Sequence, residues 1–332
     1  MKHILFALAT LAWFLAPSHG HAADELVFGL IGTERHETLL KSFAPLSEAL
    51  ARCLGIPVRV TVHQDYAGAI WDMRSGRTHF AWMGNKAALE AVDSAGAEVG
   101  LMALSRNDGA GYFSHLIVRK DSGLISPQDV LARAADLTLA LGDPNSTSGS
   151  LVPGYYLFAT RNLDPETLFK RTIRAQHEEN FLAVAQGRAD VAATNSVDLQ
   201  RFKSRYPSEW AGIRIIWTSP RIPSDPIVWK SSLPDPLKKA IRECFISFGK
   251  PAPGKGRAEL QAEADTLADL QWTGFVPSDN SQLAPVRRIE LYRRMRTLEA
   301  DDTMPADVRT ARIKAIDEAL LLLGAPEDVP AP

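Results

Sequence analysis

The sequence lacks several features that would assign it to common protein classes. It has no basic excess, because 37 Lys and Arg stand against 39 Asp and Glu, which excludes a typical nucleic-acid-binding protein. Its eight histidines are scattered, and no His/Cys spacing fits a zinc site. Beyond the first residues, no stretch is long and apolar enough to cross a bilayer. We therefore expect no metal, no cofactor and no nucleic-acid partner.

Cysteine is also scarce, with Cys53 and Cys244 as its two occurrences. An oxidising compartment would permit a bond between them. Both lie in predicted helices, where buried free thiols are also common. The sequence leaves both alternatives open.

The N-terminus is typical of an export signal. Lys2 and His3 form a basic start, residues 4–17 form an apolar core, and small residues at 20–23 suit a signal peptidase. The alternative, a retained anchor, is disfavoured because Asp24 and Glu25 follow so closely. We predict a signal peptide over residues 1–23. The remaining chain, about 300 residues, is long enough for two hydrophobic cores.

Strands and helices alternate along the first third of the chain. Apolar runs at 26–31, 58–62 and 80–84 indicate strands, and the spacing of leucines in 39–54 indicates a helix. This order is typical of βαβ units in an α/β fold.

A second α/β segment interrupts the first. We predict a first lobe formed by residues 24–116 and 220–280, and an inserted second lobe formed by residues 117–219. Two crossover strands would join the lobes and leave a cleft between them. Small-molecule sites concentrate at such domain interfaces.

The stretch from Gly142 to Ser150 is the most informative segment. A buried strand is predicted at 137–141 and an apolar helix from Leu151, so Ser146, Thr147 and Ser148 fall at a helix N-terminus. Free backbone amides and hydroxyls there suit a tetrahedral oxyanion. Ser and Thr are also ordinary N-caps, so the local pattern alone does not decide between cap and site.

The C-terminal part becomes charged and helical. We predict helices over residues 281–325 and a disordered tail over residues 326–332. The helices are a candidate surface for a homodimer. The alternative is that they wrap the first lobe.

With these lobes in place, the chain resembles the periplasmic phosphonate-binding proteins of ABC transporters, within the phosphate/phosphite/phosphonate receptor family. The matching stretches are 65–68 (Asp-Tyr-Ala-Gly), 81–85 (Ala-Trp-Met-Gly-Asn), 142–149 (Gly-Asp-Pro-Asn-Ser-Thr-Ser-Gly), 151–156 (Leu-Val-Pro-Gly-Tyr-Tyr), 170–172 (Lys-Arg-Thr), 177–180 (His-Glu-Glu-Asn), 192–195 (Ala-Ala-Thr-Asn), 215–220 (Ile-Ile-Trp-Thr-Ser-Pro) and 222–229 (Ile-Pro-Ser-Asp-Pro-Ile-Val-Trp). The resemblance implies a two-lobe periplasmic-binding-protein fold (type II-like), a periplasmic location and an inner-membrane ABC permease as partner.

The resemblance also implies a ligand site. Ser146, Thr147 and Ser148 would hold the phosphonate oxygens. Tyr66 would close on them from the first lobe, and His177 would donate another hydrogen bond. Asp225 would face the substituent on phosphorus, which in amino-phosphonate binders is an ammonium group.

Two departures from the family pattern concern the tail of the ligand. Met83 stands where the Trp-x-Gly-Asn turn usually has Tyr. Val197 is aligned with the Glu that relatives carry after Thr-Asn-Asn-Thr, and Asp198, one residue on, is expected to point elsewhere. We therefore expect a more apolar tail pocket and a weakened preference for aminoalkyl tails.

Three functions follow from these observations. The first is capture of a phosphonate, or a phosphite- or phosphate-like oxyanion, and its delivery to the permease, without catalysis. The second is presentation of the ligand to a sensor kinase, which the sequence does not separate from the first. The third is a serine phosphoesterase with Ser146 or Ser148 as nucleophile and His177 as base, but no carboxylate is evidently placed to orient His177.

Overall fold

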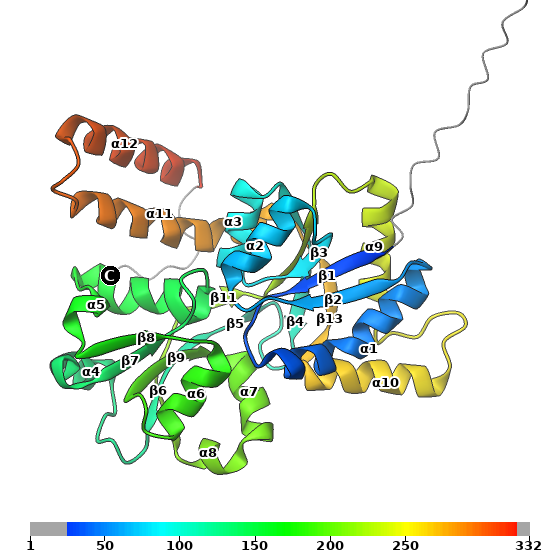
Figure 1. The fold of residues 1–332 in the computed structure, drawn as a ribbon, viewed down its shortest axis with the longest axis horizontal. Helices are drawn as coiled ribbons and strands as arrows, with labels where there is room; N and C mark the ends of the chain where they lie inside the picture. Colours follow the sequence, from blue (N-terminus) through cyan, green and yellow to red (C-terminus); the bar gives the residue numbers. More distant parts are fainter. Residues whose placement is uncertain (1–24, 324–332) are drawn as a thin grey trace, which may run out of the picture.

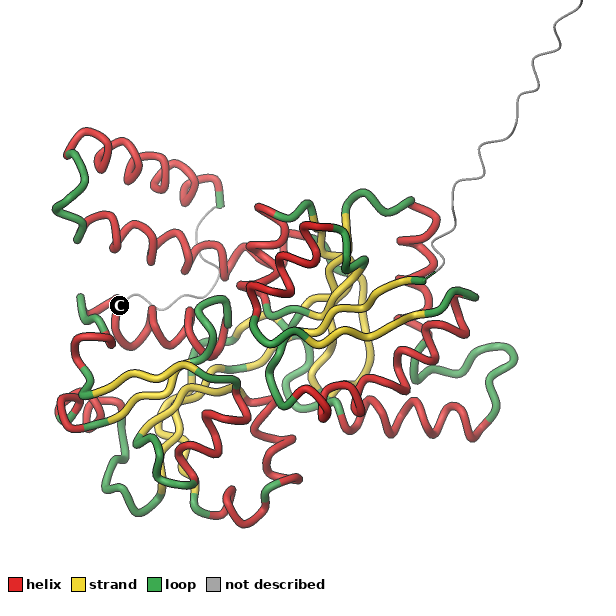
Figure 2. The backbone as a smooth tube through the Cα atoms, in the orientation of Figure 1, coloured by secondary structure: helices red, strands yellow, loops and turns green. Residues whose placement is uncertain are grey.

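The computed structural model describes residues 25–323, so the predicted signal peptide and the predicted C-terminal tail lie outside the described residues. Two separate β-sheets, each with helices packed against it, form two lobes that lie side by side (Figure 1, Figure 2). The predicted two-lobe α/β fold is confirmed. No helix in the described part of the chain is both long and apolar enough to span a membrane.

The first lobe contains a six-stranded sheet in the order β13-β4-β12-β3-β1-β2. Its first three strands pair in parallel, as the βαβ pattern predicts, whereas β12 and β13 run antiparallel to their neighbours. The sheet is therefore mixed rather than wholly parallel. Its strands are β1 (Leu26–Leu30), β2 (Val58–Val62), β3 (Phe80–Trp82), β4 (Ala97–Ser105), β12 (Pro226–Lys230) and β13 (Trp272–Pro277).

Aromatic side chains fill the core of this lobe. The ring of Phe28 stacks on Phe80 with centroids 4.9 Å apart, and the ring of Phe43 stacks on Trp82 at 5.4 Å. All four side chains are buried, so they hold helix and sheet together by removing large apolar areas from water. The helices of this lobe are α1 (His36–Leu54), α2 (Tyr66–Ser75), α3 (Asn85–Ser94), α9 (Asp235–Ser247) and α10 (Arg257–Asp269).

Cys53 and Cys244 form a disulfide between α1 and α9. The bond joins residues 191 positions apart, so it connects the part of the first lobe that precedes the inserted lobe with the part that follows it. This resolves the alternative that the sequence leaves open.

The second lobe contains a five-stranded sheet in the order β10-β6-β9-β7-β8. Two hydrophobic clusters, one with Phe158 and one with Phe181, pack on it. Its strands are β6 (Ser114–Arg119), β7 (Thr138–Leu141), β8 (Arg171–Arg174), β9 (Val191–Asn195) and β10 (Ile213–Thr218). Its helical segments are α4 (Pro127–Ala132), η1 (Ala134–Asp136), η2 (Thr147–Leu151), η3 (Gly154–Phe158), η4 (Ala159–Arg161), α5 (Pro165–Leu168), α6 (His177–Ala185), α7 (Ser196–Arg205) and α8 (Pro207–Ala211).

The chain passes between the lobes along two neighbouring strands. β5 (Gly111–Tyr112) leads from the first sheet to β6, and β11 (Ile222–Pro223) leads from β10 back to β12. The two strands pair antiparallel, with Ile222 opposite Tyr112. They form the predicted pair of crossovers.

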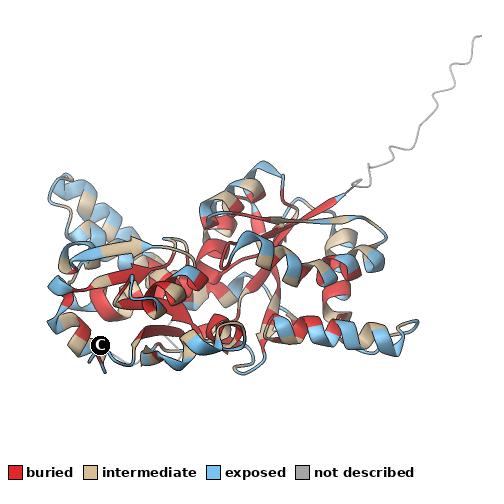
Figure 3. Ribbon diagram, turned by 60° about the horizontal axis from the view of Figure 1, so that its bottom comes forward, coloured by how far each residue is buried: buried red, intermediate tan, exposed pale blue. Residues whose placement is uncertain are grey.

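The C-terminal segment forms a helical hairpin. A 3₁₀ turn, η5 (Asn280–Leu283), leads into α11 (Ala284–Glu299), which packs on α3, and α12 (Ala306–Leu322) packs back on α11. The hairpin lies beside the second lobe (Figure 1), and most of α12 is exposed, whereas the strands of both sheets are largely buried (Figure 3). The hairpin therefore does not simply wrap the first lobe.

Candidate functional site

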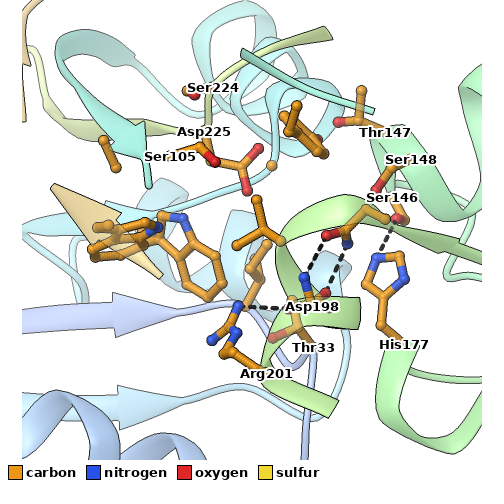
Figure 4. Close-up of a pocket in the computed structure, with 18 of the residues that line it drawn as sticks. Thr33, Ser105, Ser146, Thr147, Ser148, His177, Asp198, Arg201, Ser224 and Asp225 are labelled. Carbon is orange, nitrogen blue, oxygen red and sulfur yellow. Dashed lines mark hydrogen bonds and ion pairs between the residues drawn. The ribbon is translucent and has the colours of Figure 1, made fainter. Parts of the chain in front are cut away.

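A small cavity lies between the two lobes. Residues of both lobes line it, so its shape depends on how closely the lobes approach. The lining residues are Ile31, Thr33, Tyr66, Trp82, Gly84, Ala103, Ser105, Tyr112, Ser146, Thr147, Ser148, His177, Asn195, Val197, Asp198, Arg201, Ser224, Asp225 and Trp272, many of which are drawn in Figure 4.

The turn after β7 brings three hydroxyl groups to the cavity. Ser146, Thr147 and Ser148 are all almost completely buried. The Ser146 hydroxyl accepts a hydrogen bond from the Gly149 amide at 3.0 Å, so it caps the π-helical turn η2. Ser146 can therefore cap this turn and line the cavity at the same time.

Two glycines allow this turn to close tightly. The Gly142 amide donates to the Gly149 carbonyl at 2.7 Å. A Cβ on Gly149 would lie 2.9 Å from the Ser146 hydroxyl and 3.0 Å from the His177 ring, and a Cβ on Gly142 would lie 2.9 Å from the Gly149 Cα. A larger residue at either position would push the hydroxyls out of place.

The first lobe contributes the N-termini of two helices to the same end of the cavity. Tyr66 begins α2, is buried, and hydrogen-bonds Ser146; burial raises the pKa of its phenol well above 10, so the group stays a neutral donor. The amide of Lys86, at the start of α3, donates to the Thr147 hydroxyl at 2.8 Å. Helix N-termini carry partial positive charge, which favours an anion between them.

His177 lies at the start of α6, beside the hydroxyl turn. Its Nε2 lies 3.4 Å from the Ser146 hydroxyl, and burial lowers the pKa of the imidazole, which favours the neutral ring. Its Nδ1 is buried and has no hydrogen-bond partner among the described residues. No carboxylate of residues 25–323 therefore orients this ring, and the group can serve as a hydrogen-bond donor.

Two carboxylates, those of Asp198 and Asp225, also line the cavity. Asp225 is partly buried, and desolvation raises the pKa of its carboxyl group to about 7. A hydrogen bond from Tyr112 counteracts that rise, and the negative charge of Asp198 adds to it. The Asn85 amide is 3.5 Å from the Asp225 carboxylate. The two carboxylates thus lie close enough to influence each other.

The structure corrects the expectation for Val197 and Asp198. Thr194-Asn195-Ser196-Val197 corresponds to the Thr-Asn-Asn-Thr pattern, so the acidic residue that follows it is Asp198. Asp198 is buried and lines the cavity (Figure 4). The Asn195 side chain caps α7 and donates to the Asp198 carboxylate at 2.7 Å, which turns that carboxylate toward the cavity. The second carboxylate is present, and the argument for a weakened aminoalkyl preference loses its basis.

Met83 does not line the cavity. Its side chain is buried in the core of the first lobe, between cavity-lining Trp82 and Gly84. The Met83 amide donates to the Pro226 carbonyl at 3.2 Å, so the chain still follows the strand geometry of β3. Successive side chains of an extended strand point to opposite faces, and this places Met83 away from the cavity. The other predicted residues, Val197 included, line the cavity.

Two of the lining residues that the sequence did not predict contact the carboxylates. Tyr112 belongs to β5, and its phenol hydrogen-bonds both Ser148 and Asp225. Arg201 is buried and pairs with Asp198 at 2.5 Å. The spacing of Asp198 and Arg201, three positions apart on a helix, was a signal for that pair. No three His, Cys, Asp or Glu side chains of the described chain are grouped as a metal site requires.

Comparisons with known proteins agree on one family. Residues 28–283 match the family described as "ABC transporter, phosphonate, periplasmic substrate-binding protein". The chain is 38% identical over 317 residues, 95% of this chain and 90% of the other, to the phosphonates-binding periplasmic protein of Escherichia coli.

Solved structures give the same result for the fold. A binding-protein component of a Pseudomonas aeruginosa ABC phosphonate transporter is 40% identical, with a TM-score of 0.83 over 90% of this chain and 96% of that one. PhnD1 of Prochlorococcus marinus, solved with methylphosphonate, is 18% identical, with a TM-score of 0.69 over 80% of this chain and 97% of that one.

Proposed function

Because the chain belongs to the periplasmic phosphonate-binding family of ABC transporters, we propose that its cavity binds a phosphonate dianion whose short tail carries an ammonium group. The observation that carries this proposal is the polarity of the cavity. Three hydroxyls, Tyr66 and His177 line the cavity together with two carboxylates, those of Asp198 and Asp225.

Neutral groups suffice for the head group. Hydroxyl donors and helix N-termini surround the position of the phosphonate, and Arg201 is the sole Lys or Arg among the described lining residues. Hydrogen bonds to an ionised group are about twice as strong as neutral ones, and more so where water is excluded. A dianion can therefore be held without a lysine or arginine at its oxygens. Binding between the lobes favours the closed arrangement over an open one.

A calorimetric titration tests the ligand assignment. We expect 2-aminoethylphosphonate to bind roughly tenfold or more tightly than ethylphosphonate, because its ammonium group meets the partly buried carboxylate of Asp225. Methylphosphonate, phosphite and phosphate test the head group alone, and sulfate is the control. Equal binding of ethylphosphonate would contradict the assigned tail, and sulfate binding as tight as any phosphonate would contradict the assigned head group.

The proposal includes the route of the protein and its cargo. Residues 1–23 are removed on export, and the closed protein passes its ligand to a permease in the inner membrane.

A hydrolase would need a base oriented by a third group. The Ser146–His177 pair lacks such a group on His177 Nδ1 within the described chain. Capture without chemistry is the function that this pair supports.

Self-association through the C-terminal helices is part of the same proposal. Leu321 and Leu322 of α12 are 80% and 90% exposed, which is unusual for neighbouring leucines on one helix end. We expect the double change Leu321→Glu/Leu322→Glu to shift a dimer to monomer in sedimentation velocity without altering phosphonate affinity. A wild-type chain that sediments as a monomer at high concentration would contradict the dimer.

A further inference from the structure

An ion network crosses the cleft beside the ligand cavity. It consists of Glu34 from the first lobe and Glu178, Asp198, Arg201 and Arg205 from the second, and it is called the interlobe ion network below. Arg201 pairs with Glu34 at 3.1 Å, and Arg205 pairs with both Glu34 and, at 3.4 Å, Glu178. Each acid of the network is almost completely buried.

Backbone and hydroxyl groups complete the network. The Arg35 amide donates to Glu178 at 2.9 Å, and the Glu178 amide donates to the Thr33 carbonyl at 3.2 Å, both across the cleft. The Tyr206 hydroxyl donates to Glu178 at 2.5 Å. Because its members come from both lobes, the network is complete only when the lobes are together. Separating the lobes would break the ion pairs between Glu34 and the two arginines, and each of these charges would then have to be hydrated separately.

Arg201 is the member that reaches the ligand cavity. It is 5% exposed and lines the cavity (Figure 4). One terminal nitrogen contacts Asp198, which also lines the cavity, and the other contacts Glu34 on the opposite lobe. Its Nε is buried without a hydrogen-bond partner in the described structure. The guanidinium of Arg201 therefore contacts both Asp198 at the cavity and Glu34 on the opposite lobe.

We propose that Arg201 is a positioning residue that sets tail specificity by compensating the charge of Asp198 and tying that compensation to lobe closure. The inference rests on the proposed function. With Arg201 in place, Asp198 shows the ligand little net charge, and a neutral tail is tolerated beside it. Without Arg201, the charge of Asp198 would be uncompensated beside the cavity, whereas Glu34 would keep its pair with Arg205. A cationic tail would then be favoured and a neutral one penalised.

Calorimetry with two ligands separates these effects. The measured quantity is the tail ratio, the Kd for ethylphosphonate divided by the Kd for 2-aminoethylphosphonate. In Arg201→Met we expect weaker binding of both ligands and a tail ratio raised roughly tenfold, the size of effect a charge gives at this range. Arg201→Lys, which keeps the charge, should hold the ratio near that of the wild type. Lys203→Met, an exposed cation on the same helix, is the matched control.

Two further variants complete the test. In Glu34→Gln both ligands should weaken by the same factor, because closure is impaired while Asp198 stays compensated. The double variant Glu34→Gln/Arg201→Met removes one negative and one positive charge, so the net charge of the interlobe ion network is unchanged. It replaces Arg201→Met in the test if that single variant does not fold. Its tail ratio should still rise, because Asp198 is again uncompensated. An unchanged tail ratio in the folded Arg201 variants would overturn the inference. Wild-type protein that binds neither ligand would instead overturn the proposed function.

Discussion

Replacing Ser146 and Ser148 together by alanine is expected to weaken the binding of every phosphonate by roughly 10²- to 10⁴-fold. Each hydroxyl is buried at the end of the cavity proposed for the head group. A hydrogen bond to a charged group contributes about 1.5–3 kcal/mol, and two such bonds are lost. The loss concerns the head group alone, so the tail ratio should stay constant while both affinities fall. Calorimetry with methyl-, ethyl- and 2-aminoethylphosphonate measures this.

Ser150→Ala is the matched control for the double variant. Ser150 belongs to the same turn, but its hydroxyl accepts from Arg174 at 3.3 Å and does not line the cavity. We expect wild-type affinity from it. Thermal melting accompanies both titrations, because Ser146 also caps η2 and its loss costs about 1 kcal/mol of stability. Affinity of a well-folded double variant within a few-fold of the wild type would refute the assignment of the head-group site.

The head-group end of the site was predictable because its parts are local. A buried strand, a tight turn between Gly142 and Gly149 and a run of hydroxyls all lie within fifteen residues. Turn chemistry and helix capping fix the geometry of such a segment almost independently of the rest of the chain. The arrival of Tyr66 and His177 at the same end depends on the lobes, and it was predicted from the resemblance.

The tail end was predicted less well because it depends on one junction between strand and helix. Asn195 ends β9 and caps α7, and Asp198 is the third residue after the cap. Asn followed three positions later by an acidic residue is a signature of a helix start, in which both side chains turn back toward the first turn. That signature was present in the sequence and predicts the direction of Asp198. Aligning Val197 with the family's Glu misplaced it by one position.

Arg201 and Met83 show what a sequence cannot supply alone. The pairing of Arg201 with Glu34 joins residues 167 positions apart in different lobes, and no local rule predicts that contact. For Met83 the controlling fact is that the strand geometry of β3 continues one residue beyond its last paired position. Both outcomes are set by tertiary packing.

The balance between ammonium-tailed and neutral phosphonates is expected to change with pH through Asp225. Burial raises the pKa of this carboxyl group to about 7, so it is largely protonated below that pH. An ammonium tail needs the carboxylate, and each pH unit below the pKa weakens its binding by up to about tenfold. The tail ratio should therefore rise by roughly 100-fold from about pH 5 to about pH 8. The ammonium group lowers the second pKa of its own phosphonate head, so each affinity is corrected for the ionisation of the free ligand before the ratio is taken.

The groups that face Asp225 support this assignment. Tyr112 and Tyr66 have pKa values raised well above 10 by burial, and the pKa of Arg201 is raised through its acidic neighbours despite its burial, so all three keep one form over this range. Burial lowers the pKa of His177, which favours the neutral imidazole. Asp198 stays paired with Arg201. Calorimetric titrations at four pH values should trace a single step near pH 7.

The same shift predicts how the unliganded protein responds to pH. The folded chain holds a proton on Asp225 up to about pH 7, whereas an unfolded aspartate releases it near pH 4. The folded state therefore binds more protons in this window, and Asp225 makes the free energy of unfolding fall as pH rises from about 4 to 7. Asp225→Asn should remove both this slope and the pH dependence of the tail ratio. If the ratio in Asp225→Asn kept the wild-type pH profile, Asp225 would not be the group that meets the tail.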